Sequence, residues 1–146
     1  SVASFAPAAA GAYTLSLVVN DGTENSAPDQ VNVQAITPLQ CVSDAAAAAI
    51  ATINDAAATD IDAIGHREAL VNFVEQGRTA AQNANPALAL TRFGEALRRT
   101  DGCTLRGAPD PGGVEQDWMI GCAPAQTAYT HIRRAMDCAA LPPLVP

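Results

Sequence analysis

The first part of the chain alternates between apolar and polar residues in two stretches, residues 12–20 and residues 30–36. Alternation with a period of two is typical of a β-strand that buries one face. The turn sequence Asn20-Asp21-Gly22 separates the two stretches and predicts an antiparallel hairpin. The apolar face of this hairpin consists of Tyr13, Leu15, Leu17, Val19, Val31, Val33 and Ala35.

After Pro38 the spacing of apolar residues changes to that of amphipathic helices. Helices are predicted over residues 39–57 and 66–83, from Pro86 onward with Asn85 as the N-cap, and from Pro124 onward. The third helix should end at Gly102 in a left-handed C-cap, and residues 103–117 should form a loop. Because the connections are short, neighbouring helices should be antiparallel.

These elements predict an α+β chain, in which a partial β-sandwich of two or three antiparallel strands precedes an antiparallel helical bundle. The third strand would lie in residues 1–5. The expected parts are residues 1–36 for the strands, residues 37–141 for the helices and residues 142–146 for an extended tail. Two or three strands are only marginally stable alone in water, so the sheet needs a partner surface.

Composition and charge narrow the classes of partner. Aromatic residues make up only 4% of the chain and alanine supplies 32 residues, so the helices bury little apolar area and need covalent staples or an interface. A net charge of −7 argues against nucleic acid and against anionic membrane surfaces. No apolar run is long enough to span a membrane. The expected partners are therefore copies of the chain itself.

The four cysteines contain no CxxC pair, which favours disulfides over zinc and predicts a secreted or cell-surface protein. No signal peptide opens the sequence, so we expect either that a leader was removed or that this is a fragment of a longer precursor.

Two segments carry a resemblance to known families. Residues 10–22 and 26–33 resemble the last third of a polycystic-kidney-disease-type (PKD-type), immunoglobulin-like repeat of bacterial surface proteins. The earlier strands of such a repeat are absent, so one copy cannot close the sandwich. Residues 66–136 resemble a small helical module that follows such repeats in secreted bacterial proteins. The stretches that carry this second resemblance are residues 67–70, 101–103, 107–110 and 117–122, with Gln126 and Tyr129.

The second resemblance implies an architectural module without enzymatic activity, stapled by two cysteines. Cys103 would pair with Cys122 and close the Gly/Pro-rich loop. Cys41 and Cys138 depart from the usual pattern and suggest an added bridge between the first and last helices. Four cysteines allow three connectivities, and the other two remain open at this point.

Candidate metal and catalytic groups are sparse. Asp101, Asp110 and Asp117 in or beside the predicted loop could supply oxygen ligands to calcium, although the twelve-residue calcium-loop spacing is absent. The alternative is that these carboxylates cap helices and turns, and the acidic residues around the hairpin turn have the same two interpretations. No GxSxG, P-loop or GxGxxG motif occurs in the sequence. The sequence therefore predicts no enzyme and no cofactor.

The favoured hypothesis is an extracellular structural protein that assembles into a filament or surface polymer through its incomplete N-terminal sheet. The alternative is a non-catalytic C-terminal interaction module cut from a larger secreted enzyme or adhesin. A calcium-dependent carbohydrate- or matrix-binding module is a third hypothesis.

Overall fold

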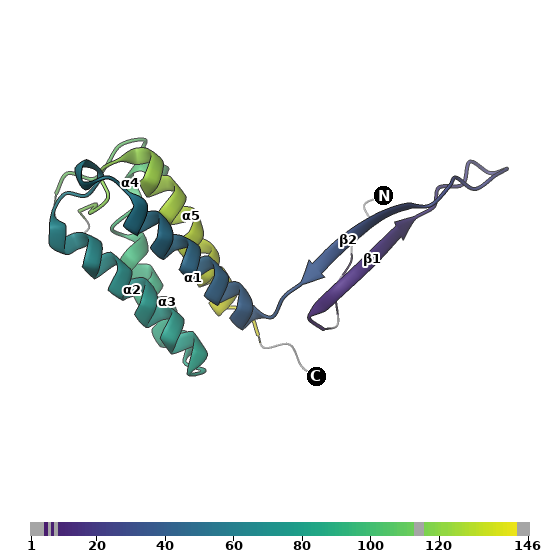
Figure 1. Ribbon diagram of the computed structural model, residues 1–146, viewed down its shortest axis with the longest axis horizontal. Coiled ribbons are helices and arrows are strands. Elements are labelled where there is room, and N and C mark those ends of the chain that lie inside the picture. Colours follow the sequence, from purple (N-terminus) through teal and green to yellow (C-terminus); the bar gives the residue numbers. More distant parts are fainter. Residues whose placement is uncertain (1–4, 6, 8, 113–115, 143–146) are drawn as a thin grey trace. The chain divides into compact units, whose positions relative to one another are not determined.

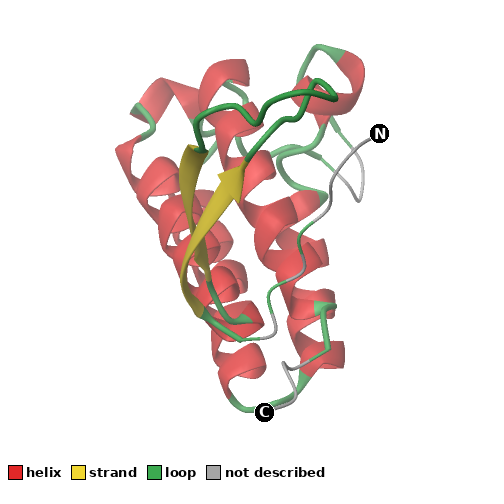
Figure 2. Cartoon of the chain, turned by 90° about the vertical axis from the view of Figure 1, so that its right-hand side faces the viewer, coloured by secondary structure: helices red, strands yellow, loops and turns green. Residues whose placement is uncertain are grey.

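The computed structural model describes Phe5, Pro7, residues 9–112 and residues 116–142. Over these residues the chain is α+β, with one two-stranded antiparallel sheet, five α-helices and a short 3-10 helix (Figures 1 and 2). The strands belong to a compact unit that ends at Thr37, and the helices form a second unit, Pro38–Pro142. Most of the expected tail, residues 143–146, lies outside the described residues.

The hairpin of the first unit pairs β1 (Gly11–Leu17) with β2 (Asp29–Ala35). The antiparallel ladder runs from Gly11 opposite Ala35 to Leu17 opposite Asp29. The predicted hairpin is therefore confirmed, but a β-sandwich is not seen, since the described residues contain a single two-stranded sheet. Residues 1–4, which would supply most of the expected third strand, lie outside the described part.

The strand β1 ends at Leu17, three residues before the predicted end at Asn20. Beyond the ladder, Asn20 pairs with Asn25 in an isolated bridge. Between bridge and ladder, residues 18–19 of one arm face residues 26–28 of the other, so the register shifts by one. Pro28 lies in this bulge and has no N–H to donate, which explains the interruption.

The second unit is an up-down-up-down bundle of four long helices (Figure 1). The five helices are α1 (Pro38–Asp55), α2 (Ile64–Gln82), α3 (Pro86–Leu97), α4 (Gly102–Arg106) and α5 (Cys122–Ala139). Helix α1 packs against α2 and α5, and α3 packs against the same two helices from the other side. The predicted antiparallel bundle is confirmed.

The core of the bundle combines many alanines with a few large side chains. The fully buried alanines are Ala46, Ala49, Ala89, Ala96, Ala128 and Ala135. The largest buried side chains include Phe93, Ile53, Leu70, Met119 and Ile132. Small residues let helix backbones approach closely, as at Gly77, where an added Cβ would lie 2.6 Å from the Phe93 ring. Each alanine removes little apolar area from water, so this core gains less per residue than a leucine-rich core.

Two predicted boundaries are wrong for reasons of packing. Gly102 is not a left-handed C-cap but the first residue of α4, which occupies part of the predicted loop 103–117. A Cβ at Gly102 would collide with the carboxylate of Asp117, so close packing explains the glycine. Helix α5 begins at Cys122, and Pro124 lies within its first turn, where a missing N–H is tolerated.

The predicted start of α3 is confirmed. The side-chain oxygen of Asn85 accepts a hydrogen bond from the Leu88 N–H at 3.1 Å, and Pro86 is the first helical residue.

Candidate functional site

The strongest candidate is the apolar face of the hairpin. In the antiparallel ladder Tyr13 lies directly opposite Val33, and Leu15 lies opposite Val31. Directly opposite residues share a face, so these four side chains form one apolar stripe, as the alternation predicts. The other face carries polar pairs, such as Thr14 and Asn32, whose side chains hydrogen-bond at 2.8 Å.

The two remaining predicted assembly residues lie where the apolar stripe breaks down. Leu17 is the last residue of β1 and lies opposite Asp29, so its cross-strand neighbour is acidic. Val19 lies in the bulged region, where its N–H donates to Ser26 Oγ at 3.0 Å and its carbonyl accepts from the Ser26 N–H at 2.7 Å. The structure therefore brings Tyr13, Leu15, Val31 and Val33 together but separates Val19 from them.

Exposure distinguishes this face from a hydrophobic core. Leu17 is 60% exposed, Val19 58% and Val31 57%. Tyr13 is half-buried because the ring of Phe5 contacts it edge-on at 5.1 Å and its hydroxyl donates to the Ala9 carbonyl at 2.7 Å. No described residue before Val42 is buried, so the hairpin has an apolar face without a core behind it.

Two disulfides hold the helical unit, one at each end of the bundle. Cys103 in α4 pairs with Cys122 at the start of α5, with Cα atoms 5.2 Å apart. Cys41 in the first turn of α1 pairs with Cys138 in the last turn of α5, with Cα atoms 5.9 Å apart. Of the three possible connectivities, the structure has the one that the sequence favours.

The three aspartates proposed for calcium lie near one another, but their carboxylates have other partners. Asp117 is buried and accepts hydrogen bonds from the N–H groups of Gly102 and Asp110, at 3.1 and 2.6 Å. Arg106 approaches Asp101 at 3.5 Å and Asp110 at 3.0 Å. Among the described residues, no group of three or more His, Cys, Asp or Glu could hold a metal ion. The geometry thus corresponds to the capping alternative.

The acidic residue in the hairpin turn shows the same behaviour. One carboxylate oxygen of Asp21 accepts hydrogen bonds from the N–H groups of Thr23 and Glu24, at 2.8 and 2.9 Å. The hydrogen bond from the Glu24 N–H, followed by that from Thr23, lowers the pKa of Asp21, because both favour the charged form.

Trp118 anchors the segment between the disulfide loop and α5. Its indole stacks on the ring of His66 at 4.3 Å and lies 6.0 Å from Phe73, and both partners belong to α2. The guanidinium of Arg99 lies over the same indole at 4.8 Å. These contacts agree with the expectation that the lone tryptophan packs this segment on the helices.

Sequence reasoning missed the role of Arg67. Its guanidinium donates to the carbonyls of Ile53, Asn54, Ala56 and Ala57, which follow the end of α1. The last carbonyls of a helix have no partner inside it, and cations are favourable at that end. The only sequence signal is an arginine early in the next helix, which is common and not specific.

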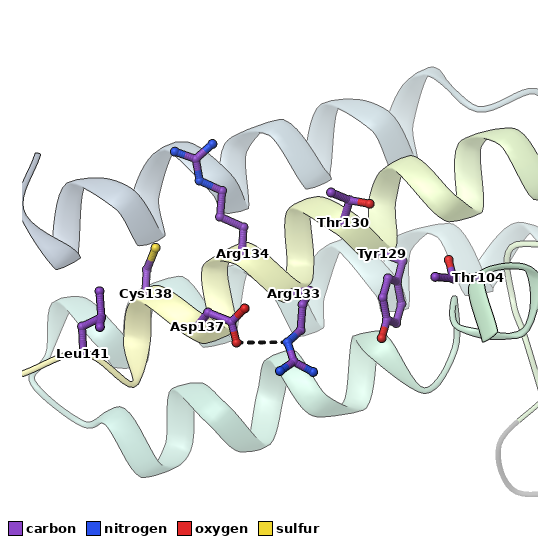
Figure 3. Close-up of a pocket in the computed structure, with 8 residues that line it drawn as sticks. All are labelled: Thr104, Tyr129, Thr130, Arg133, Arg134, Asp137, Cys138 and Leu141. Carbon is purple, nitrogen blue, oxygen red and sulfur yellow. Dashed lines mark hydrogen bonds and ion pairs between the residues drawn. The ribbon is translucent and has the colours of Figure 1, made fainter. Parts of the chain in front are cut away.

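A shallow hollow of about 460 Å³ lies along α5 and is the best-formed depression among the described residues (Figure 3). Arg133 bonds Asp137 one turn away at 3.0 Å, and Figure 3 shows Arg134 pointing to the other side of α5. Both members of the pair are more than half exposed, so the pair contributes little. This open surface does not enclose a set of reactive groups.

No helix in the described part of the chain combines the length and hydrophobicity needed to cross a bilayer. The chain matches no family model, no curated protein and no solved structure. The resemblance to the end of a PKD-type repeat and to a helical module therefore stays a prediction that rests on the residues alone.

Proposed function

We propose that this chain is an extracellular structural protein that self-assembles into a filament or surface polymer through its incomplete N-terminal sheet. One observation carries the proposal: the hairpin has an apolar face, yet no described residue before Val42 is buried. All buried core residues lie between Val42 and Cys138, in the helical unit. The helical unit can therefore be stable alone, whereas the hairpin lacks a hydrophobic core of its own.

The exposed face gives a second copy something to bind. Fully burying a valine or leucine side chain stabilises by about 1.5–3 kcal/mol. Leu17 and Val31 are more than half exposed, so each would gain roughly half of that amount, about 1 kcal/mol, in an interface. Main-chain hydrogen bonds at the edges of a two-stranded sheet would add to this gain. A contact between two different surfaces repeats head to tail and produces a polymer.

Two disulfides within 146 residues support the extracellular part of the proposal, because disulfides persist in oxidising compartments. The unfinished sheet is also what the resemblance to the last third of a PKD-type repeat implies: the missing strands would come from elsewhere.

Paired substitutions on the two faces of β1 test the proposal. Leu15→Glu places a charge in the apolar stripe, and its neighbour Ser16→Glu places the same charge on the polar face. We expect sedimentation velocity and negative-stain microscopy to show assemblies for the wild type and Ser16→Glu, and monomers for Leu15→Glu. Val31→Glu and Gln30→Glu repeat the comparison on β2. Circular dichroism should show an unchanged helical unit in all four variants.

A wild-type chain that stays monomeric over the whole accessible concentration range would refute self-assembly. Equal assembly of Leu15→Glu and Ser16→Glu would refute the apolar face as the contact. The alternative then gains support: a non-catalytic interaction module of a larger secreted enzyme or adhesin, whose other strands cover this face. The division into two separate units favours such a modular origin. Mass spectrometry of native material would identify a longer parent chain.

A further inference from the structure

The Cys41–Cys138 disulfide joins the place where the chain enters the helical unit to the place where it leaves. The unit begins at Pro38, and Cys41 follows three residues later in the first turn of α1. Cys138 lies in the last turn of α5, and the unit ends at Pro142. The two cysteines are 97 residues apart in sequence, whereas their Cα atoms are 5.9 Å apart. Nearly the whole bundle thus lies inside a covalent ring.

We infer that this disulfide is a load-bearing clasp, which carries tension along the chain past the helical unit. A force that pulls the two ends of the chain apart reaches Cys41, crosses the disulfide and leaves through Cys138. The residues inside the ring are not on this path, so tension does not act to unfold them. The inference rests on covalent connectivity and holds whether or not the chain assembles through its hairpin.

The hairpin lies on the same path but has no such protection. Gly11 and Ala35 are opposite one another at the open end of the ladder, and the chain continues from both. Tension therefore separates the strands from that end and breaks the cross-strand hydrogen bonds one pair after another. The described residues hold no disulfide across the two strands. Under tension the hairpin should open while the bundle stays folded.

Lengths from the structure make the inference measurable. The hairpin spans 24 residue steps from residue 11 to residue 35 and would release about 80 Å at roughly 3.5 Å per residue. The ring spans 97 steps, of which the Cys103–Cys122 disulfide withholds 19, so 78 steps remain. Opening the ring would release about 270 Å at the same rise per residue.

Optical tweezers with handles at both ends of the full chain test the inference. We expect the wild type to extend by no more than the hairpin and the terminal segments allow, without a step near 270 Å. The double variant Cys41→Ser/Cys138→Ser should gain that step. The matched control Cys103→Ser/Cys122→Ser removes the other disulfide and should not gain it. Mass mapping without reduction establishes the pairing in each sample.

A second pulling geometry covers the case in which the double variant does not fold. Handles on azide-bearing residues at the exposed positions Asp55 and Asn83 place the load inside the ring, with both disulfides intact. The bundle should then unfold and release at most about 100 Å, the contour of the 28 residues between the two sites. A step near 270 Å in the wild type pulled by its ends would overturn the inference. So would unpaired Cys41 and Cys138, or the lack of a step in a folded double variant.

Discussion

Arg67 is expected to be among the costliest surface-reaching side chains to remove from the helical unit. Its guanidinium bridges α2 to the end of α1 through four backbone carbonyls. Two of these, on Asn54 and Ala57, belong to exposed residues, and water can replace the lost bonds there. The other two belong to Ile53, which is fully buried, and Ala56, which is 9% exposed. Water cannot readily replace the arginine at these two carbonyls.

The substitution Arg67→Met keeps the apolar stem and removes the donors. Hydrogen bonds to charged groups contribute about 1.5–3 kcal/mol each, so loss of the two shielded bonds should cost about 3 kcal/mol at the lower end of that range. Arg67→Lys should retain part of this stability, because a single ammonium cannot reproduce the planar fork that binds several carbonyls.

The assay is chemical denaturation of the oxidised chain, followed by helical circular dichroism. Arg78→Met is the matched control, since Arg78 lies on the same helix and makes an ion pair with Glu75 at 2.6 Å, with both side chains about one-third exposed. Such a pair is worth less than about 0.5 kcal/mol. If Arg67→Met and Arg78→Met destabilise the chain equally, the carbonyl contacts do not hold the two helices together.

Three further predictions concern other positions. Gly77→Ala should destabilise by about 1–3 kcal/mol because its Cβ meets the buried Phe93 ring, whereas Gly65→Ala in the same helix has open space and should stabilise by up to about 1 kcal/mol; thermal unfolding of both decides. Asp117→Ala leaves two backbone N–H groups without an acceptor and should cost about 2–4 kcal/mol in denaturation, and a cost near zero would contradict the capping role. Because the pKa of Asp21 is lowered in the folded hairpin, its contribution is present above the ordinary aspartate pKa and is lost as the pH falls through the lowered value; an NMR titration midpoint at the ordinary value would refute this.

Features encoded by local pattern were predictable from the sequence. The period of apolar residues placed α1 and α2 within two residues of their observed ends. Asn85 followed by Pro86 marked the start of α3, because the cap and the proline act on the backbone next to them. Alternation also gave the shared face of the hairpin, since opposite residues in a ladder follow from parity alone.

Features that depend on distant partners were not predictable. Gly102 was interpreted as a C-cap because glycine after a helix usually has that role, but here it leaves room for Asp117, fifteen residues further along the chain. Arg67 gives no local sign that it binds the end of the preceding helix. The early end of β1 arises from the bulge opposite Val18 and Val19, which depends on Pro28 in the other arm. In each case the deciding contact pairs residues that no short pattern links.

The two units obtain their stability in opposite ways, and this contrast supports the functional proposal. The alanine-rich bundle removes little apolar area per residue, but rings of 97 and 19 residues restrict its unfolded state by about 4.7 and 3 kcal/mol in the chain-entropy model. The hairpin has no disulfide in its described part and no buried residue. Residues such as Leu17 and Val31 remain exposed there, although a polar residue at either position would make a lone hairpin more soluble. Retaining apolar side chains on an uncovered face is therefore best explained by a surface that covers them in the assembled protein.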